Sequence, residues 1–111
     1  MTAIKTTNEL NPIFLQSLRA VKVAEWKVNE FNGEIKKDDQ GRPMYRGDAL
    51  QALRVKDGQI AGAVFGQVSI NVLTPIELAP MSLYTPVGVY VWNDYDARKT
   101  SITIDSLAPV K

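Results

Sequence analysis

Hydrophobic and polar residues alternate along much of this chain, and a period of two indicates β-strands. The alternation is clearest from residue 59 to residue 73, where one face is apolar and the opposite face is polar. The apolar face consists of Val64, Val68, Ile70 and Val72, and the polar face of Gln67, Ser69 and Asn71. This pattern predicts a strand over 59–73.

Two further strands are predicted in the second half of the chain. Residues 87–92 alternate, with valines on one face and Tyr90 and Trp92 on the other, and residues 101–107 form the last strand. A polar loop, 93–100, is expected between them. The proline-rich segment before residue 87 predicts irregular backbone, because proline cannot donate a hydrogen bond within a sheet.

The first half of the chain is less regular. Apolar residues alternate from 19 to 35 with a change of phase near residues 24–25, which predicts a long strand with a β-bulge. The run Asp38-Asp39-Gln40-Gly41 has the composition of a tight turn, so this strand is expected to fold back as a β-hairpin.

Two segments allow more than one element. Residues 48–55 fit a short helix capped by Asp48 or a strand, and we favour a strand because only three residues separate them from the next strand. Residues 11–18 fit one short helix, with Asn11 as its N-cap and Pro12 at its first position, or an irregular lead-in to the first strand.

Five strands, mostly antiparallel, in about 90 residues predict an all-β fold, a small five-stranded antiparallel barrel with a β-hairpin. A short N-terminal helix is compatible with it. With 111 residues and a hydrophobic fraction of 45%, the chain is expected to form one domain with a core. We divide it into a loosely ordered leader, 1–18, and the barrel domain, 19–111.

The composition argues against several classes of function. The chain has no cysteine and no histidine, which removes thiolate nucleophiles, histidine bases and the usual zinc sites. We therefore expect no enzyme, no cofactor, no metal and no small-molecule substrate. No apolar run approaches the roughly 18 residues of a membrane span, so we expect no membrane partner and a cytoplasmic protein.

Charge is clustered rather than abundant. The formal net charge is only +1, yet residues 19–56 contain nine Lys or Arg against six Asp or Glu, and residues 57–97 contain no Lys or Arg. The run KKDDQGRPMYR, residues 36–46, places four cations around Tyr45. Cations interleaved with aromatic rings are typical of proteins that bind single-stranded nucleic acid, where cations neutralise phosphates and rings stack on bases.

This reasoning selects nine candidate binding residues, and each has an ordinary structural alternative. Tyr45 fits a strand tyrosine that covers the edge of the core, and Phe65 fits a partner interface. The two lysines of the hairpin fit a solvated tip. The candidates are Lys36, Lys37, Arg42, Tyr45, Arg46, Phe65, Tyr95, Arg98 and Lys99.

Several short runs between residues 36 and 111 resemble the single-stranded DNA-binding proteins of filamentous phages. The run 40–45 (QGRPMY) is similar to the Gln-Gly-Lys-Pro-Tyr run of their protruding hairpin, with one methionine inserted. The runs 86–90 (PVGVY), 104–105 (ID) and 107–109 (LAP) are similar to their last two strands. The chain departs from the family in the extra N-terminal 20 residues, in the acidic pair 38–39 and in Ser106, which replaces an arginine.

The resemblance implies a small homodimeric OB-type barrel that coats single-stranded DNA cooperatively and largely without sequence preference during phage or plasmid rolling-circle replication. It implies DNA contacts for Arg42 and Tyr45 and a contact between neighbouring dimers near Tyr95. If the chain is phage-encoded, it implies the host cytoplasm. RNA is the alternative ligand.

Two other readings of the sequence remain. The first is a non-enzymatic accessory β-barrel that binds a protein through an exposed apolar set, Phe65, Tyr90 and Trp92. The second is a structural oligomer in which the same aromatic residues are buried between subunits. The positions of Tyr45 and Phe65 separate these readings: the two side chains are either solvated in a cationic groove or sealed in an interface.

Overall fold

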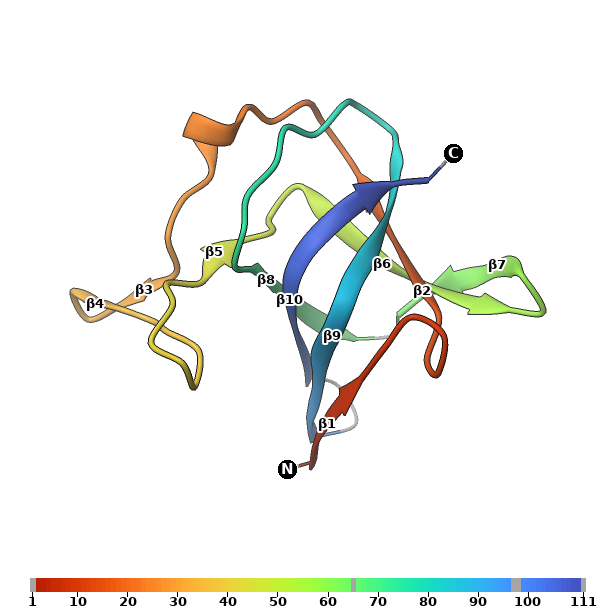
Figure 1. Ribbon diagram of the computed structural model, residues 1–111, viewed down its shortest axis with the longest axis horizontal. Coiled ribbons are helices and arrows are strands. Elements are labelled where there is room, and N and C mark those ends of the chain that lie inside the picture. The colour runs from red at the N-terminus through yellow and green to blue at the C-terminus, as the bar shows by residue number, and fades with distance from the viewer. Residues whose placement is uncertain (1, 65, 97–98, 111) are drawn as a thin grey trace.

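The computed structural model describes residues 2–64, 66–96 and 99–110. Its longest strands lie at the centre of a curled sheet. The sheet has eight strands in the described residues, and Figure 1 shows it as an open, strongly curved surface. Its strands are β1 (Thr2–Thr6), β2 (Ile13–Ser17), β5 (Tyr45–Arg46), β6 (Leu50–Lys56), β7 (Gln59–Ala63), β8 (Gln67–Val72), β9 (Leu83–Asp96) and β10 (Lys99–Pro109). A separate hairpin consists of β3 (Glu30–Phe31) and β4 (Glu34–Ile35), and η1 (Val23–Glu25) is one turn of 3-10 helix.

The strand order is β5-β8-β10-β9-β2-β6-β7. The pair β8–β10 is parallel, and the other strands pair antiparallel. The long strand β9 has two partners on the edge that faces away from β10: its N-terminal end pairs with β2 and its C-terminal half pairs with β1. Figure 1 shows the β6–β7 hairpin extending away on one side and the β3–β4 hairpin on the opposite side.

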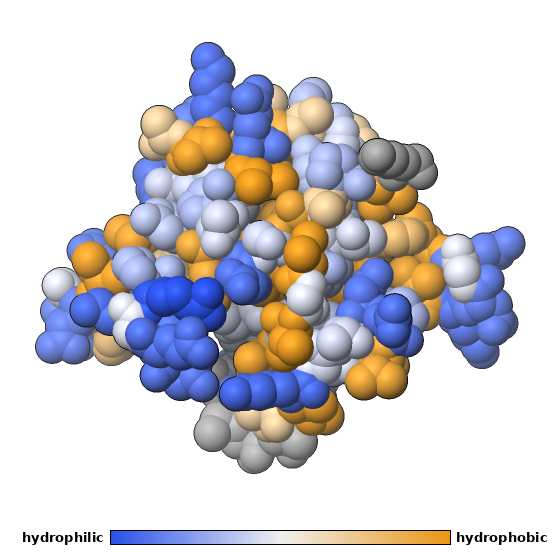
Figure 2. All heavy atoms as spheres, in the orientation of Figure 1, coloured by the Kyte–Doolittle hydropathy of each residue, from blue (hydrophilic) through white to orange (hydrophobic). Residues whose placement is uncertain are grey.

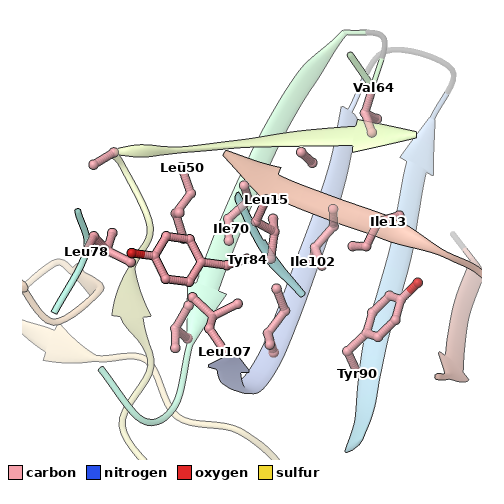
Figure 3. Close-up of a cluster of buried hydrophobic side chains, with 14 of the residues drawn as sticks. Ile13, Leu15, Leu50, Val64, Ile70, Leu78, Tyr84, Tyr90, Ile102 and Leu107 are labelled. Carbon is pink, nitrogen blue, oxygen red and sulfur yellow. The ribbon is translucent and has the colours of Figure 1, made fainter. Parts of the chain in front are cut away.

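The concave side of the sheet holds the core, to which β2, β6, β8, β9 and β10 contribute (Figure 3). Burying each large apolar side chain contributes roughly 1.5–3 kcal/mol. Two phenol groups of the core are paired: the Tyr90 hydroxyl donates a hydrogen bond to the Asn11 carbonyl, and the Tyr84 hydroxyl accepts one from the Ala79 amide at 2.8 Å. Neither phenol oxygen is left unsatisfied, whereas the Asn93 side-chain oxygen is buried without a hydrogen-bond partner among the described residues.

The all-β class predicted from the sequence is confirmed, whereas the five-stranded antiparallel barrel is not. The sheet of the described residues is mixed and open, and it has more strands than expected. No helix of the described residues is long and apolar enough to cross a membrane.

Residues 2–17, assigned above to a leader, form β1 and β2 of the main sheet. The helical alternative for 11–18 is wrong, because every second side chain of β2 is buried: Ile13, Leu15 and Ser17 face the core. The strand favoured for 48–55 is confirmed as β6.

The long strand predicted over 19–35 is wrong. Val21 pairs with Leu78, whereas Val28 pairs with Tyr45, so the two ends of this segment bond to different partners. Between them the chain makes the η1 turn, which lies where the apolar phase changes. The change of phase therefore marks a turn between two partners and not a β-bulge.

The strand predicted over 59–73 divides into β7 and β8, because β7 pairs with β6 and β8 pairs with β5 and β10. The loop predicted over 93–100 is shorter than expected, since β9 continues to Asp96 and β10 begins at Lys99.

Tyr90 and Trp92 are buried in the core, with exposed fractions of 1% and 6%, and the valines of the same strand face outward. The exposed aromatic set expected for a protein interface is therefore wrong at these two residues.

Candidate nucleic-acid interface

Residues 28–46 form an arm of three short segments that run back and forth, and the last of them pairs with β8. The first turn of the arm is Asn32-Gly33, which joins β3 to β4. Both residues have positive φ, 54° and 79°, as a two-residue hairpin turn requires. Asn and Gly are the residues that adopt this backbone at least cost, so the local sequence determines where the arm reverses.

The second turn is at 38–41, and here the turn predicted from the sequence is confirmed. The Asp38 carboxylate accepts hydrogen bonds from the amides of Gln40 and Arg42, at 3.1 and 2.7 Å. Gly41 supplies the positive φ, 81°, and beyond it Pro43 pairs with Lys37. An aspartate that bonds to the backbone ahead of it is a common way to close such a turn.

The arm is fixed to the sheet at its base. Tyr45 pairs with Val72 of β8, and the Gly47 amide donates to the Ile70 carbonyl at 2.7 Å. The Asn29 side chain donates to the Asn71 carboxamide oxygen at 2.8 Å, so this buried polar group is satisfied. These bonds hold the segments that carry the candidate cations in one position relative to β8.

The tip of the arm bends over the outer face of the sheet and does not extend freely. The Arg42 guanidinium contacts the Asp38 carboxylate at 2.9 Å and the Asp105 carboxylate of β10 at 3.2 Å. Lys5 of β1 lies 3.7 Å from the Asp39 carboxylate. A hollow of about 530 Å³ remains between the tip and the strands, with Val91 and residues of β10 in its wall.

The same contacts set the charge state of the turn. Burial raises the pKa of Asp38, but the Arg42 amide, the Arg42 guanidinium and the Gln40 amide together outweigh it and hold that pKa below its ordinary value of 3.8. Asp38 is therefore ionised at neutral pH, and it neutralises part of the positive charge of Arg42.

The arm brings together five of the nine candidate residues. Lys36 and Lys37 are exposed, and the Lys36 ammonium lies 5.9 Å from the centre of the Phe31 ring, within the range of a cation–π contact. Tyr45 is half-buried and packs against the core, which is the structural alternative named above. Arg46 is exposed. Figure 2 shows hydrophilic side chains gathered over this side of the molecule.

Lys99 lies apart from the arm. It is exposed and pairs with Gln67 at the start of β8, whereas Arg46 pairs with Asn71 near the end of that strand. Four residues along a strand correspond to about 13 Å. Phe65, Arg98 and the side chain of Tyr95 lie outside the described residues.

The structure adds residues that sequence reasoning did not select. Asp105 is one, because its pairing with Arg42 joins positions 63 residues apart. Arg19, Trp26 and Lys27 are the others: they line a hollow together with Arg46. The count of cations over 19–56 contained this signal, but only the fold shows which of them converge.

The described residues contain no group of three or more acidic side chains that is arranged to hold a metal ion. What the arm offers is exposed ammonium and guanidinium groups on a fixed backbone, which suits binding of an anion. Comparison with protein-family profiles, with curated proteins and with solved structures finds no match for this chain.

Proposed function

We propose that this protein is a non-enzymatic single-stranded DNA-binding protein that coats DNA with little sequence preference, as a homodimer, during phage or plasmid rolling-circle replication. The observation that carries the proposal is the arm. Its base is held to β8 by Gly47 and Asn29, and it presents three exposed cations, Lys36, Lys37 and Arg46. Exposed cations on a fixed backbone are what binding to a phosphate backbone requires, although the arm as a whole carries four cations and four carboxylates.

The strand connections support an OB-like barrel as the scaffold. If β7 and β8 are taken as two parts of one bent strand, the strand neighbours follow the order β2, β6, β7–β8, β10, β9 and again β2. OB folds are partly open five-stranded barrels whose oligonucleotide contacts include the loops between strands 1 and 2 and between strands 4 and 5. When β2, β6, β7–β8, β9 and β10 are counted as strands 1 to 5, the loop between strands 1 and 2 is residues 18–49, which contains the arm. The loop between strands 4 and 5 is bordered by Lys99.

Phosphate contacts rather than stacking would supply most of the affinity. Stacking on an aromatic residue contributes ~1–3 kcal/mol per base, but half-buried Tyr45 has only part of its ring available. Three exposed lysine and arginine side chains each release counterions on meeting a phosphate. The proposal therefore predicts binding that weakens steeply with salt.

The competing reading, an accessory protein with an exposed aromatic surface, loses two of its three residues because Tyr90 and Trp92 are buried. We therefore keep DNA binding as the single proposed function.

Fluorescence anisotropy of labelled oligo-dT, with a duplex of equal length as competitor and a series of salt concentrations, tests the proposal. We expect tight, salt-sensitive binding to the single strand and much weaker binding to the duplex. Replacing Lys37 with alanine should reduce the salt dependence, whereas Lys56→Ala, which removes one exposed cation at the end of β6, serves as the matched control. No binding of oligo-dT at low salt would refute the proposal.

A further inference from the structure

A small hollow beside the base of the arm collects three cations that come from separate parts of the chain. Arg19 follows β2, Lys27 follows η1 and Arg46 ends β5, and all three side chains are exposed. In the described part of the chain, none of the three forms an ion pair. The acidic residues at the rim are Glu25 and Asp48, so the lining carries three positive and two negative charges.

The backbone beneath these cations is held by hydrogen bonds. The Arg46 amide donates to the Lys27 carbonyl at 2.8 Å, next to the Val28–Tyr45 bridge. Lys27 and Arg46 therefore lie opposite each other on neighbouring segments. Like charges directly opposite each other on paired strands are destabilising, and an anion between them would remove the repulsion.

One of the two rim carboxylates is already engaged. The Glu25 carboxylate accepts a hydrogen bond from the Lys22 amide at 2.8 Å, at the start of η1. This contact orients the carboxylate toward the start of the 3-10 turn. Asp48 is exposed on the other side of Gly47. Among the described residues, no carboxylate forms an ion pair with Lys27 or Arg46. The repulsion between these two cations is therefore not offset by such a contact.

The floor of the hollow is apolar and fixed. Val21, Trp26, Ala49 and Leu78 form it, and each is less than 10% exposed. The Trp26 indole N–H donates to the Ile76 carbonyl at 2.8 Å, which fixes the orientation of the ring. A charge contact above such a floor is screened less than one in open water.

The size of the hollow indicates what it holds. Its volume is about 100 Å³, which is room enough for one phosphate group beside the cations of the rim. Stacking of a base on Trp26 is unsuitable, because that ring is only 9% exposed.

We propose that this hollow is a phosphate subsite, in which Lys27 and Arg46, with Arg19 at the rim, hold one phosphodiester group of a bound single strand. The inference rests on the proposed function and adds to it a site that includes Arg19 and Lys27, outside the turn of the arm. It continues the path of the strand from the exposed lysines of the arm toward η1, on the side where Figure 1 shows η1 and β5.

The first test compares Lys27→Gln with Lys56→Gln, which removes the same charge from the end of β6. Each phosphate contact on a single strand contributes about 0.7 to the slope of log K against log salt. Lys27→Gln should therefore weaken binding of oligo-dT about fivefold at 0.1 M salt and lower the slope by about 0.7. The melting temperature of the free variant should be unchanged or higher, because a repulsion is removed, whereas a merely structural lysine would lower it.

The second test follows the Trp26 indole N–H in a proton–nitrogen NMR spectrum, assigned through Trp26→Phe, while oligo-dT is added. We expect this signal and the Lys27 and Arg46 amides to shift, and the amides of β7 to remain in place. Inorganic phosphate at the same ionic strength is the control ligand. Shifts as large with phosphate as with oligo-dT would mean a site for free phosphate and would overturn the DNA assignment.

The remaining outcomes separate the two proposals. If the wild type binds oligo-dT but Lys27→Gln behaves as Lys56→Gln does and Trp26 does not shift, the subsite is wrong and the proposed function stands. If the wild type does not bind oligo-dT at all, both are wrong.

Discussion

The ion pair between Arg42 and Asp105 gives the sharpest prediction about the arm. Arg42 is the cation that the resemblance to phage proteins selects for DNA contact, yet its guanidinium already contacts two carboxylates. A phosphate must compete with Asp105 for this group. Replacing Asp105 with asparagine removes the charge and keeps the shape, so Arg42 should become more available to DNA.

The magnitude follows from exposure. The side chains of Arg42 and Asp105 are 44% and 49% exposed, so solvent screens the pair and its contribution is about 0.2–1 kcal/mol. If DNA binding breaks the pair, Asp105→Asn should increase the association constant by a factor of about 1.4–5, since 1.4 kcal/mol corresponds to about tenfold. The gain should shrink as salt rises, because salt screens the same attraction.

Anisotropy with oligo-dT measures this gain against Asp57→Asn, which removes one negative charge at the β6–β7 turn. Asparagine suits the positive φ of Asp57, 54°, so the control should fold normally. Any general effect of net charge appears in both variants. Equal gains for Asp105→Asn and Asp57→Asn would refute competition at Arg42.

Three further predictions concern the fold. Gly47→Ala places a Cβ 2.9 Å from the Ile70 side chain, so we expect a loss of roughly 1–3 kcal/mol and a melting temperature lower by about 4–13 °C; an unchanged value would contradict this close packing. Burial raises the pKa of Tyr90 to about 12, so the contribution of the neutral Tyr90 phenol to stability is complete below pH 10 and is lost as pH rises through 12. An ultraviolet titration should show one tyrosine that ionises late, and this late transition should be absent in Tyr90→Phe. The lowered pKa of Asp38 means that the turn at 38–41 is stabilised above pH 3.8 and opens at lower pH; the Gln40 amide signal should move there, and Asp38→Asn should abolish the transition.

The sequence predicted local features well where one residue pattern determines one structure. The turn at 38–41 depends on an aspartate that bonds to the following amides and on a glycine with positive φ, and both requirements can be read from four residues. The strand at 48–55 was likewise predictable, because its short connection to the next strand leaves little space for a helix.

The prediction failed where a partner far along the chain determines the outcome. Period-two alternation cannot tell one long strand from two strands with different neighbours, so 59–73 was read as one element. The pattern assigned the valines of β9 and the pair Tyr90 and Trp92 to opposite faces but did not decide which face meets the core, because only the curvature of the sheet decides which face is concave. The pairing of Arg42 with Asp105 was hidden for the same reason.

The pairing of β1 with β9 has a consequence for the order in which the protein folds. Ile4 and Trp92 are partners, although 88 residues separate them. At 5–20 residues per second, a ribosome takes roughly 4–18 s to make that interval. The β6–β7 hairpin, whose strands are adjacent in sequence, can form within about 10 µs. Strand β1, although it is synthesised before the other described strands, is therefore among the last to be paired, and until then it presents unpaired backbone that chaperones or neighbouring chains can bind.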